Sequence, residues 1–121
     1  MSKLINDQCK QELLITALEG GSNYWYLLEE EACKIMSKYK KSSGSENFWM
    51  AIKDGKSIQI HDVEEEDSLL GTISYESMEQ AEELLISEQP GHLADIISGG
   101  WDATTADVWF QYAVMGKLIF G

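Results

Sequence analysis

Residues 97–121 have the sequence ISGGWDATTADVWFQYAVMGKLIFG and form the most apolar segment of an otherwise acidic chain. Asp102 stands at a helix N-cap position, where its carboxylate can accept a hydrogen bond from a backbone N–H of the first turn. Gly116 stands where such a helix would end, because glycine adopts the left-handed conformation at little cost. The pattern predicts a buried helix that opens at Ala103, followed by a short buried strand over residues 118–120.

The bulk composition predicts one compact domain with an acidic surface. A chain of 121 residues with 44% hydrophobic residues, four Trp and five Tyr can bury a single core. Nine Lys, no Arg and 21 acidic residues give a net charge of −12. This charge argues against direct binding to nucleic acid or to an anionic membrane, which needs clustered cations. It favours a basic partner, a cation or a neutral ligand.

The two cysteines and the hydropathy of the chain predict a soluble cytoplasmic protein. Cys9 and Cys33 lack the spacing of a metal site and lie in segments with a helical pattern. We therefore expect two buried free thiols in a reducing compartment. No apolar run approaches the ~20 residues of a membrane-spanning helix, and no signal peptide is apparent.

Two helices are predicted in the N-terminal third of the chain. The first covers residues 4–19, since its apolar residues recur at helical spacing, and Gly20-Gly21 is expected to end it in a left-handed conformation. The second covers residues 28–38, with glutamates in its first turn and lysines toward its end, which complements the helix dipole.

A β-hairpin is predicted over residues 48–63, after a polar loop at 40–47. A three-residue turn, with Gly55 left-handed, places five apolar residues on one face. These are Phe48, Met50, Ile52, Ile58 and Ile60. The same register places Trp49, Gln59 and His61 together on the other face.

The remaining segments complete an α+β fold. Residues 62–67 (DVEEED) predict a solvated bend, and residues 69–73 a further strand. Ser74 is expected to cap a helix over residues 75–87, and residues 92–98 predict a short helix that ends at Gly99-Gly100. We expect four to five helices packed with a small antiparallel sheet of three to four short strands, in a single domain over residues 1–121.

The first candidate site is the acidic run in the middle of the chain, which we predict to bind a partner. Glutamates three and four apart on one helix face lie about 5 to 6 Å from each other, a spacing similar to that of nucleic-acid phosphates. Such a surface can occupy a groove built for DNA or RNA, although a purely solvated face has the same composition. The predicted residues are Asp62, Glu64, Glu65, Glu66, Asp67, Glu76, Glu79 and Glu83. Divalent metal binding by His61, Asp62 and Glu64 is a weaker alternative, because EF-hand spacing is missing.

The second candidate is a small-ligand pocket beside the glycine pair at 20–21. Asn23, Tyr24, Trp25 and Trp101 offer hydrogen bonding and stacking, in a module that could assemble as a homodimer. The alternative is a helix–helix corner whose aromatic rings fill the core.

Catalysis has less support in the sequence. His92 with Asp95, Asp102 and Asp107 are the only clustered ionisable residues of the apolar C-terminal part, and such aspartates are more often helix caps. Nothing resembles a nucleophile elbow or a phosphate-binding loop. We therefore expect a protein that is not an enzyme and carries no cofactor or bound metal.

Three segments resemble small uncharacterised proteins of bacteriophages and prophages. They are ALEGGSNYWY (residues 17–26), HLADIIS (92–98) and the closing segment, which matches the pattern DAxxADVxxQxAxxGxxxFG. The resemblance implies an accessory phage protein that acts in the bacterial cytoplasm. Many small acidic phage proteins of this kind look like counter-defence factors, among them anti-CRISPR inhibitors and scavengers of immune signalling nucleotides.

The expectation from charge and resemblance together is a non-enzymatic inhibitor. It would bind a basic, nucleic-acid-handling host effector, such as a CRISPR nuclease, through the acidic face. The alternative is a module that sequesters a small immune signalling nucleotide or another small ligand. A metal-assisted hydrolase is the third and weakest reading.

Overall fold

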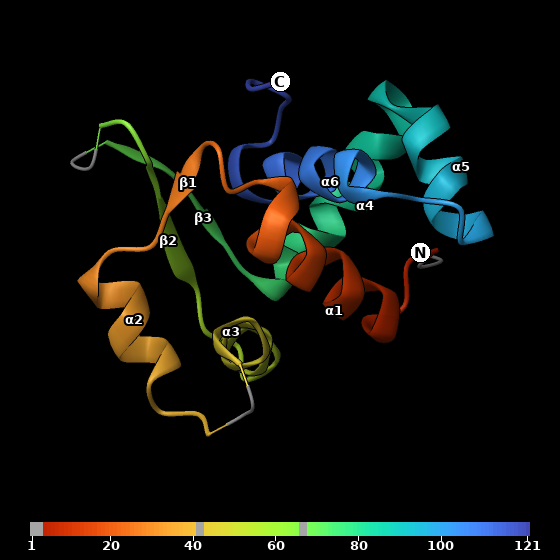
Figure 1. Ribbon diagram of the computed structural model, residues 1–121. Helices are drawn as coiled ribbons and strands as arrows, with labels where there is room; N and C mark the ends of the chain where they lie inside the picture. Colours follow the sequence, from red (N-terminus) through yellow and green to blue (C-terminus); the bar gives the residue numbers. More distant parts are fainter. Residues whose placement is uncertain (1–3, 41–42, 66–67) are drawn as a thin grey trace.

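The computed structural model describes residues 4–40, 43–65 and 68–121, and these residues fold as α+β (Figure 1). They form six α-helices, one short π-helix and one three-stranded antiparallel sheet, so the predicted fold class is confirmed with slightly more helices than expected. In chain order the elements are α1 (Asp7–Thr16), η1 (Ala17–Gly21), β1 (Tyr26–Leu27), α2 (Glu30–Met36), α3 (Gly44–Lys53), β2 (Ile58–Asp62), β3 (Leu69–Ile73), α4 (Tyr75–Glu88), α5 (Pro90–Ser98) and α6 (Ala103–Met115).

Helix α6 is the central element of the fold. Every residue from 105 to 114 is buried, because α1, η1, α4, α5 and β3 all pack around it. Its ends are as predicted. The Asp102 carboxylate accepts a hydrogen bond from the Thr105 N–H at 3.1 Å, and Gly116 is left-handed with φ of 74°. An all-round apolar helix is expected in the interior, and the sequence identified it correctly.

The sheet has the strand order β1-β2-β3 and lies beside the helical core (Figure 1). Ile58 pairs with Ile73 and Ile60 with Gly71, so the isoleucines face the core. Gly71 is required for the close packing of β3 on α6, since a Cβ there would lie 2.1 Å from the Val114 carbonyl oxygen. The second strand of the predicted hairpin is thus confirmed as β2, and the predicted strand at 69–73 is confirmed as β3.

The predicted hairpin over residues 48–63 is wrong in its first half, because residues 44–53 form α3. The Ser43 hydroxyl accepts the Glu46 N–H and caps the helix, a Ser-x-x-Glu signal that the hairpin prediction overlooked. Phe48, Trp49, Ala51 and Ile52 are buried at helical spacing. Trp49 is therefore in the core and not on a face with Gln59 and His61. Gly55 is left-handed as predicted, but it leads out of a helix.

The predicted closing strand at residues 118–120 is also wrong. The tail has no strand partner among the described residues, and Leu118 and Ile119 are exposed. The Gln111 side chain takes the place of a neighbouring strand. Its Oε1 accepts the N–H groups of Ile119 and Phe120 at 2.9 Å each, and its Nε2 donates to the Phe120 carbonyl at 3.1 Å.

The other differences concern element ends and cysteine burial. The first helix runs on as η1 at Gly20-Gly21, and neither glycine is left-handed. α2 is shorter than predicted, the 40–47 loop contains the first turn of α3, and α5 begins at Pro90. Gly99 ends α5 and Ser74 caps α4 as predicted.

Both cysteines are free, but Cys9 is only half-buried and Cys33 is exposed, so their predicted burial is wrong. In the part of the chain that the structure describes, no helix combines the length and apolar character needed to cross a membrane.

Candidate functional site

A buried carboxylate joins two of the three segments on which the resemblance rests, residues 17–26 and the closing segment. Asp107, on α6, is 7% exposed and accepts hydrogen bonds from four side chains. Ser22 Oγ and Trp25 Nε1 each donate to Oδ1 at 2.7 Å, while Tyr24 O–H donates to Oδ2 at 2.5 Å and Gln111 Nε2 at 3.2 Å. A carboxylate offers about four lone-pair directions. Each of them has a donor, so the Asp107 charge is stabilised inside the fold.

The π-helix η1 brings the glycine pair against the first turn of α6. The backbone at Gly21 passes so close that a Cβ would lie 2.8 Å from the Ala103 carbonyl oxygen. Only glycine allows this approach without a shift of the backbone. Short π-helical segments within α-helices occur frequently at functional sites, which directs attention to this junction.

A cleft of about 460 Å³ lies at the same junction. Its lining comes from η1, from the first turns of α6, from the tyrosine before β1 and from the end of the tail. The lining residues are Gly20, Gly21, Tyr24, Ala103, Thr104, Asp107 and Gly121. A volume of this size falls within the range of small-ligand sites.

Tyr24 has one exposed side and one anchored end. The residue is 50% exposed, yet its hydroxyl points inward to Asp107. Burial of the hydroxyl and the hydrogen bond to the carboxylate raise the pKa of Tyr24 to about 12. The phenol is therefore protonated at neutral pH and remains a donor to Asp107.

Of the four residues predicted to bind a small ligand, the structure places only Tyr24 in this cleft. Asn23 is exposed outside it. Trp25 is 1% exposed and stacks on Phe120 with a centroid distance of 5.3 Å, so it belongs to the core. Trp101 is half-buried and is not part of the lining. The small-ligand prediction left out Thr104 and Asp107, and the sequence named Asp107 only as a catalytic candidate. The Asp-x-x-x-Gln spacing of Asp107 and Gln111 was the available signal, because it places both side chains on one face of the helix.

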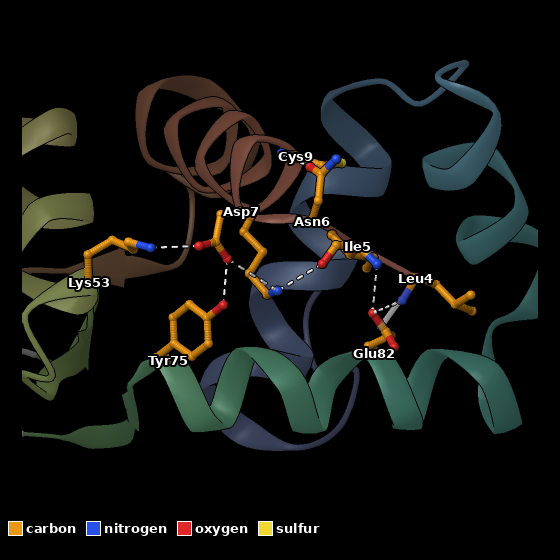
Figure 2. Close-up of polar contacts among 9 residues, drawn as sticks. Leu4, Ile5, Asn6, Asp7, Cys9, Lys53, Tyr75 and Glu82 are labelled. Atoms are coloured by element: carbon orange, nitrogen blue, oxygen red, sulfur yellow. Dashed lines mark hydrogen bonds and ion pairs between the residues drawn. The ribbon is translucent and has the colours of Figure 1, made fainter. Parts of the chain in front are cut away.

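A second polar cluster connects α1, α3 and α4 (Figure 2). The carboxylate of Asp7 lies between Lys53 Nζ, at 2.6 Å, and the Tyr75 hydroxyl, at 2.5 Å. Hydrogen bonds from Lys53 and Tyr75 lower the pKa of Asp7, and the same bond to Asp7 together with burial raises the pKa of Tyr75 to about 12. The ammonium of Lys10 is 2% exposed, donates to the Ile5 carbonyl at 2.8 Å and lies 3.8 Å from Asp7.

Glu82, which lies further along α4 than Tyr75, holds the N-terminal segment in place (Figure 2). Its Oε1 accepts the N–H groups of Leu4 at 2.9 Å and Ile5 at 2.8 Å. The residue is only 6% exposed. Like Asp107, it is an acidic residue whose role in the described structure is to satisfy internal donors.

The predicted partner-binding residues separate into two groups at opposite ends of β3. Glu64 and Glu65 are exposed at the bend after β2, where Asp62 Oδ1 accepts their N–H groups at 2.8 and 3.4 Å. Glu76 and Glu83 are exposed on α4, and Glu79 on the same helix is half-buried. Five strand residues, about 15 Å, lie between the groups. Glu66 and Asp67 lie outside the described residues.

The residues considered for metal binding and catalysis are not assembled into a site. Among the described residues, no group of three or more His, Cys, Asp and Glu side chains is arranged to hold a metal ion. His92 Nδ1 lies 3.0 Å from the Thr105 hydroxyl, while Asp102 caps α6 and Asp95 is exposed. The histidine is thus paired with a threonine.

Comparisons with protein-family models, with curated proteins and with solved structures find no match to this chain.

Proposed function

We propose that this chain is a non-enzymatic inhibitor that binds a basic, nucleic-acid-handling protein of a bacterial host through its exposed glutamates. In this proposal it acts in the bacterial cytoplasm as an accessory phage protein against host defence, and a CRISPR nuclease is the kind of effector that it would bind. The phage context rests on the sequence resemblance alone.

The observation that carries the proposal is a set of exposed carboxylates without internal counterions. Glu64, Glu65, Glu76 and Glu83 are exposed and form no ion pair with any described residue. In contrast, Asp7, Glu30 and Glu31 do form ion pairs with lysines of the described part of the chain.

With a net charge of −12 and no arginine, the molecule carries a strong negative field that would attract a basic surface. Complementary charge mainly accelerates association and selects the partner, whereas the affinity requires close packing as well. The proposal therefore predicts binding that weakens as salt rises, because exposed charges more than about 10 Å apart are screened at about 0.1 M ionic strength.

The test measures binding to a purified CRISPR nuclease loaded with its guide RNA, by biolayer interferometry at low and high salt. Two double variants remove one acidic group each, Glu64→Lys/Glu65→Lys at the bend and Glu76→Lys/Glu83→Lys on α4. At least one of them should weaken binding by more than about tenfold, which corresponds to about 1.4 kcal/mol.

The matched control is Glu30→Lys/Glu31→Lys, which makes the same change of net charge on α2. Both glutamates already pair with Lys34, at 3.4 and 3.8 Å, and lie on a different helix. Binding by the control should stay near that of the parent chain. If all three variants lose affinity equally, net charge and no particular surface drives the binding. If the parent chain binds no nuclease in a representative panel, the proposal is wrong.

A further inference from the structure

The cleft between η1 and α6 has a lining made largely of backbone. Three of its seven lining residues are glycines, and a fourth is alanine. At Gly20 a Cβ would meet nothing within 4 Å, so there is open space directly above the peptide. A flat molecule could lie against such peptide groups, since no side chain holds it away.

Tyr24 gives this cleft an aromatic face with a fixed orientation. Its ring is half exposed, and the hydroxyl is tied to Asp107 at 2.5 Å. Stacking on an anchored ring loses little conformational entropy, because the ring is already held in its position before a ligand arrives. The first-turn N–H groups of Ala103 and Thr104 have no partner within the helix, and the exposed Thr104 hydroxyl adds a donor and acceptor beside them.

The charges of the lining exclude both kinds of ion. No lysine lines the cleft and the chain has no arginine, so no cationic side chain neutralises a phosphate there. The N-terminus of α6 does favour an anion, but the carboxylates of Asp102, which caps that helix, and of Asp107 oppose a phosphate. A cation is equally unsupported, because the two oxygens of Asp107 already accept four hydrogen bonds. What remains is an uncharged ligand with polar edges.

From these observations we infer that the cleft lined by Gly20, Tyr24 and Thr104 is a binding site for a small uncharged ligand that carries a planar heterocycle and has the size of a nucleoside. The ligand stacks on Tyr24, and its polar edge faces the first turn of α6. This site does not depend on the acidic surface of the proposed function. It also differs from a trap for signalling nucleotides, since phosphate groups reduce binding.

The test titrates the full chain, labelled with ¹⁵N, with adenosine, guanosine, cytidine and uridine and then with their 5′-monophosphates. At least one nucleoside should give saturable shifts of the Gly20, Gly21 and Thr104 amides. The matching monophosphate should bind more than about fivefold more weakly. Two like charges ~4 Å apart repel each other by about 1 kcal/mol even in water, and this repulsion between phosphate and carboxylate corresponds to about that factor.

Gly20→Phe places a large side chain at a lining position where a Cβ would meet nothing, and Gly91→Phe is its matched control. Gly91 also has nothing within 4 Å of a Cβ and lies on α5, outside the lining. Gly20→Phe should abolish the saturable shifts, whereas Gly91→Phe should keep them. A third variant, Thr104→Lys, adds a cation to the lining and should reverse the preference in favour of the monophosphate.

Three results would overturn the inference. They are the absence of saturable shifts with all four nucleosides, unchanged nucleoside binding by a folded Gly20→Phe chain, and monophosphates that bind the parent chain as tightly as nucleosides do. If Gly20→Phe fails to fold, the outcome rests on Thr104→Lys, and an unchanged preference in that variant contradicts the site. Binding to the nuclease should not change in Thr104→Lys, so failure here leaves the proposed function standing.

Discussion

The carboxylates inside the helical core and those on its outer surface have the same chemistry and opposite surroundings. Glu82 and Glu83 are neighbours in α4, yet Glu82 is 6% exposed and bonded to two backbone N–H groups, while Glu83 is exposed. Asp107 and Glu64 differ in the same way. A buried charge is tolerated only where donors replace its water, and an exposed one needs none.

Because some carboxylates are buried, the net charge of the chain overstates how many of them a partner could contact. Part of the acidic composition is structural, because Asp107 joins η1 to α6 and Glu82 holds the N-terminal segment. These two carboxylates are therefore not available to pair with a basic partner protein. The acidic surface available to a partner is therefore smaller than the composition suggests, and the predicted binding residues on it are divided between the β2–β3 bend and α4.

The largest expected effect is that of Asp107→Ala. The change leaves four donors without their acceptor, among them the buried indole N–H of Trp25. Removing one member of a buried charged network typically costs about 3 to 5 kcal/mol, so we expect a loss of about 3 kcal/mol or more in the free energy of unfolding. Urea denaturation followed by circular dichroism measures it.

Asp95→Ala is the control for this prediction, since Asp95 is an exposed aspartate on α5. Its effect should stay within about 0.5 kcal/mol. Asp107→Asn should lie between the two, because the amide keeps one acceptor oxygen and loses the charge. Equal stability of the Asp107→Ala and Asp95→Ala chains would show that the network does not hold η1 on α6.

A smaller effect is expected within the neighbouring pair on α4. Glu82→Ala removes the acceptor of the Leu4 and Ile5 N–H groups and should cost about 1 to 2 kcal/mol. Glu83→Ala should stay within about 0.5 kcal/mol. Hydrogen exchange separates the mechanisms, because the Leu4 and Ile5 amides should exchange faster only in the first variant. Similar losses in both variants would remove the distinction between structural and exposed glutamates.

The sequence predicted an element correctly where the signals for its start, its end and its buried side all lie within that element. The helix from Ala103 has a cap, a glycine end and a largely apolar body, and it needs no neighbour to be recognised. Residues 48–52 do not have this property, because FWMAI fits a strand and a helix equally well. The capping Ser43 and Glu46 decide it, together with the core on which Phe48 and Ile52 pack.

The candidate site could be predicted only in part because its contacts are long-range. Asp107 lies more than 80 residues from Ser22, Tyr24 and Trp25, and no local rule relates these positions. The tail was predicted as a strand from its apolar residues, whereas the Gln111 side chain satisfies its backbone. A single side chain that hydrogen-bonds a backbone segment leaves no hydrophobic periodicity by which the sequence could predict it.

The smallest expected effect concerns the half-exposed carboxylate of Asp7, which stands between the buried and the exposed kinds. Its side chain is 42% exposed, and its pKa is lowered from the ordinary value of 3.8 by Lys53 and Tyr75. A carboxyl group with a depressed pKa stabilises the fold above the pKa of its unfolded state and loses that effect as the pH falls through the lower, folded value. The acid loss of stability should therefore include an Asp7 contribution below about pH 4.

Asp7→Asn should remove that contribution, so that the urea midpoint depends less on pH below about pH 4. The change in the free energy of unfolding should be less than about 1 kcal/mol, because solvent screens the pair.

The titration of Tyr75 at alkaline pH provides an independent check. The Tyr75 pKa is raised to about 12, so its contribution is complete below pH 10 and is lost as the pH rises toward 12. Asp7→Asn should lower that pKa in an ultraviolet absorbance titration, whereas Asp54→Asn, which removes the exposed acceptor of Tyr39, should leave Tyr75 unchanged. If the urea midpoint depends on pH below about pH 4 in the same way in the parent and Asp7→Asn chains, Asp7 contributes no more to stability than the exposed carboxylates do.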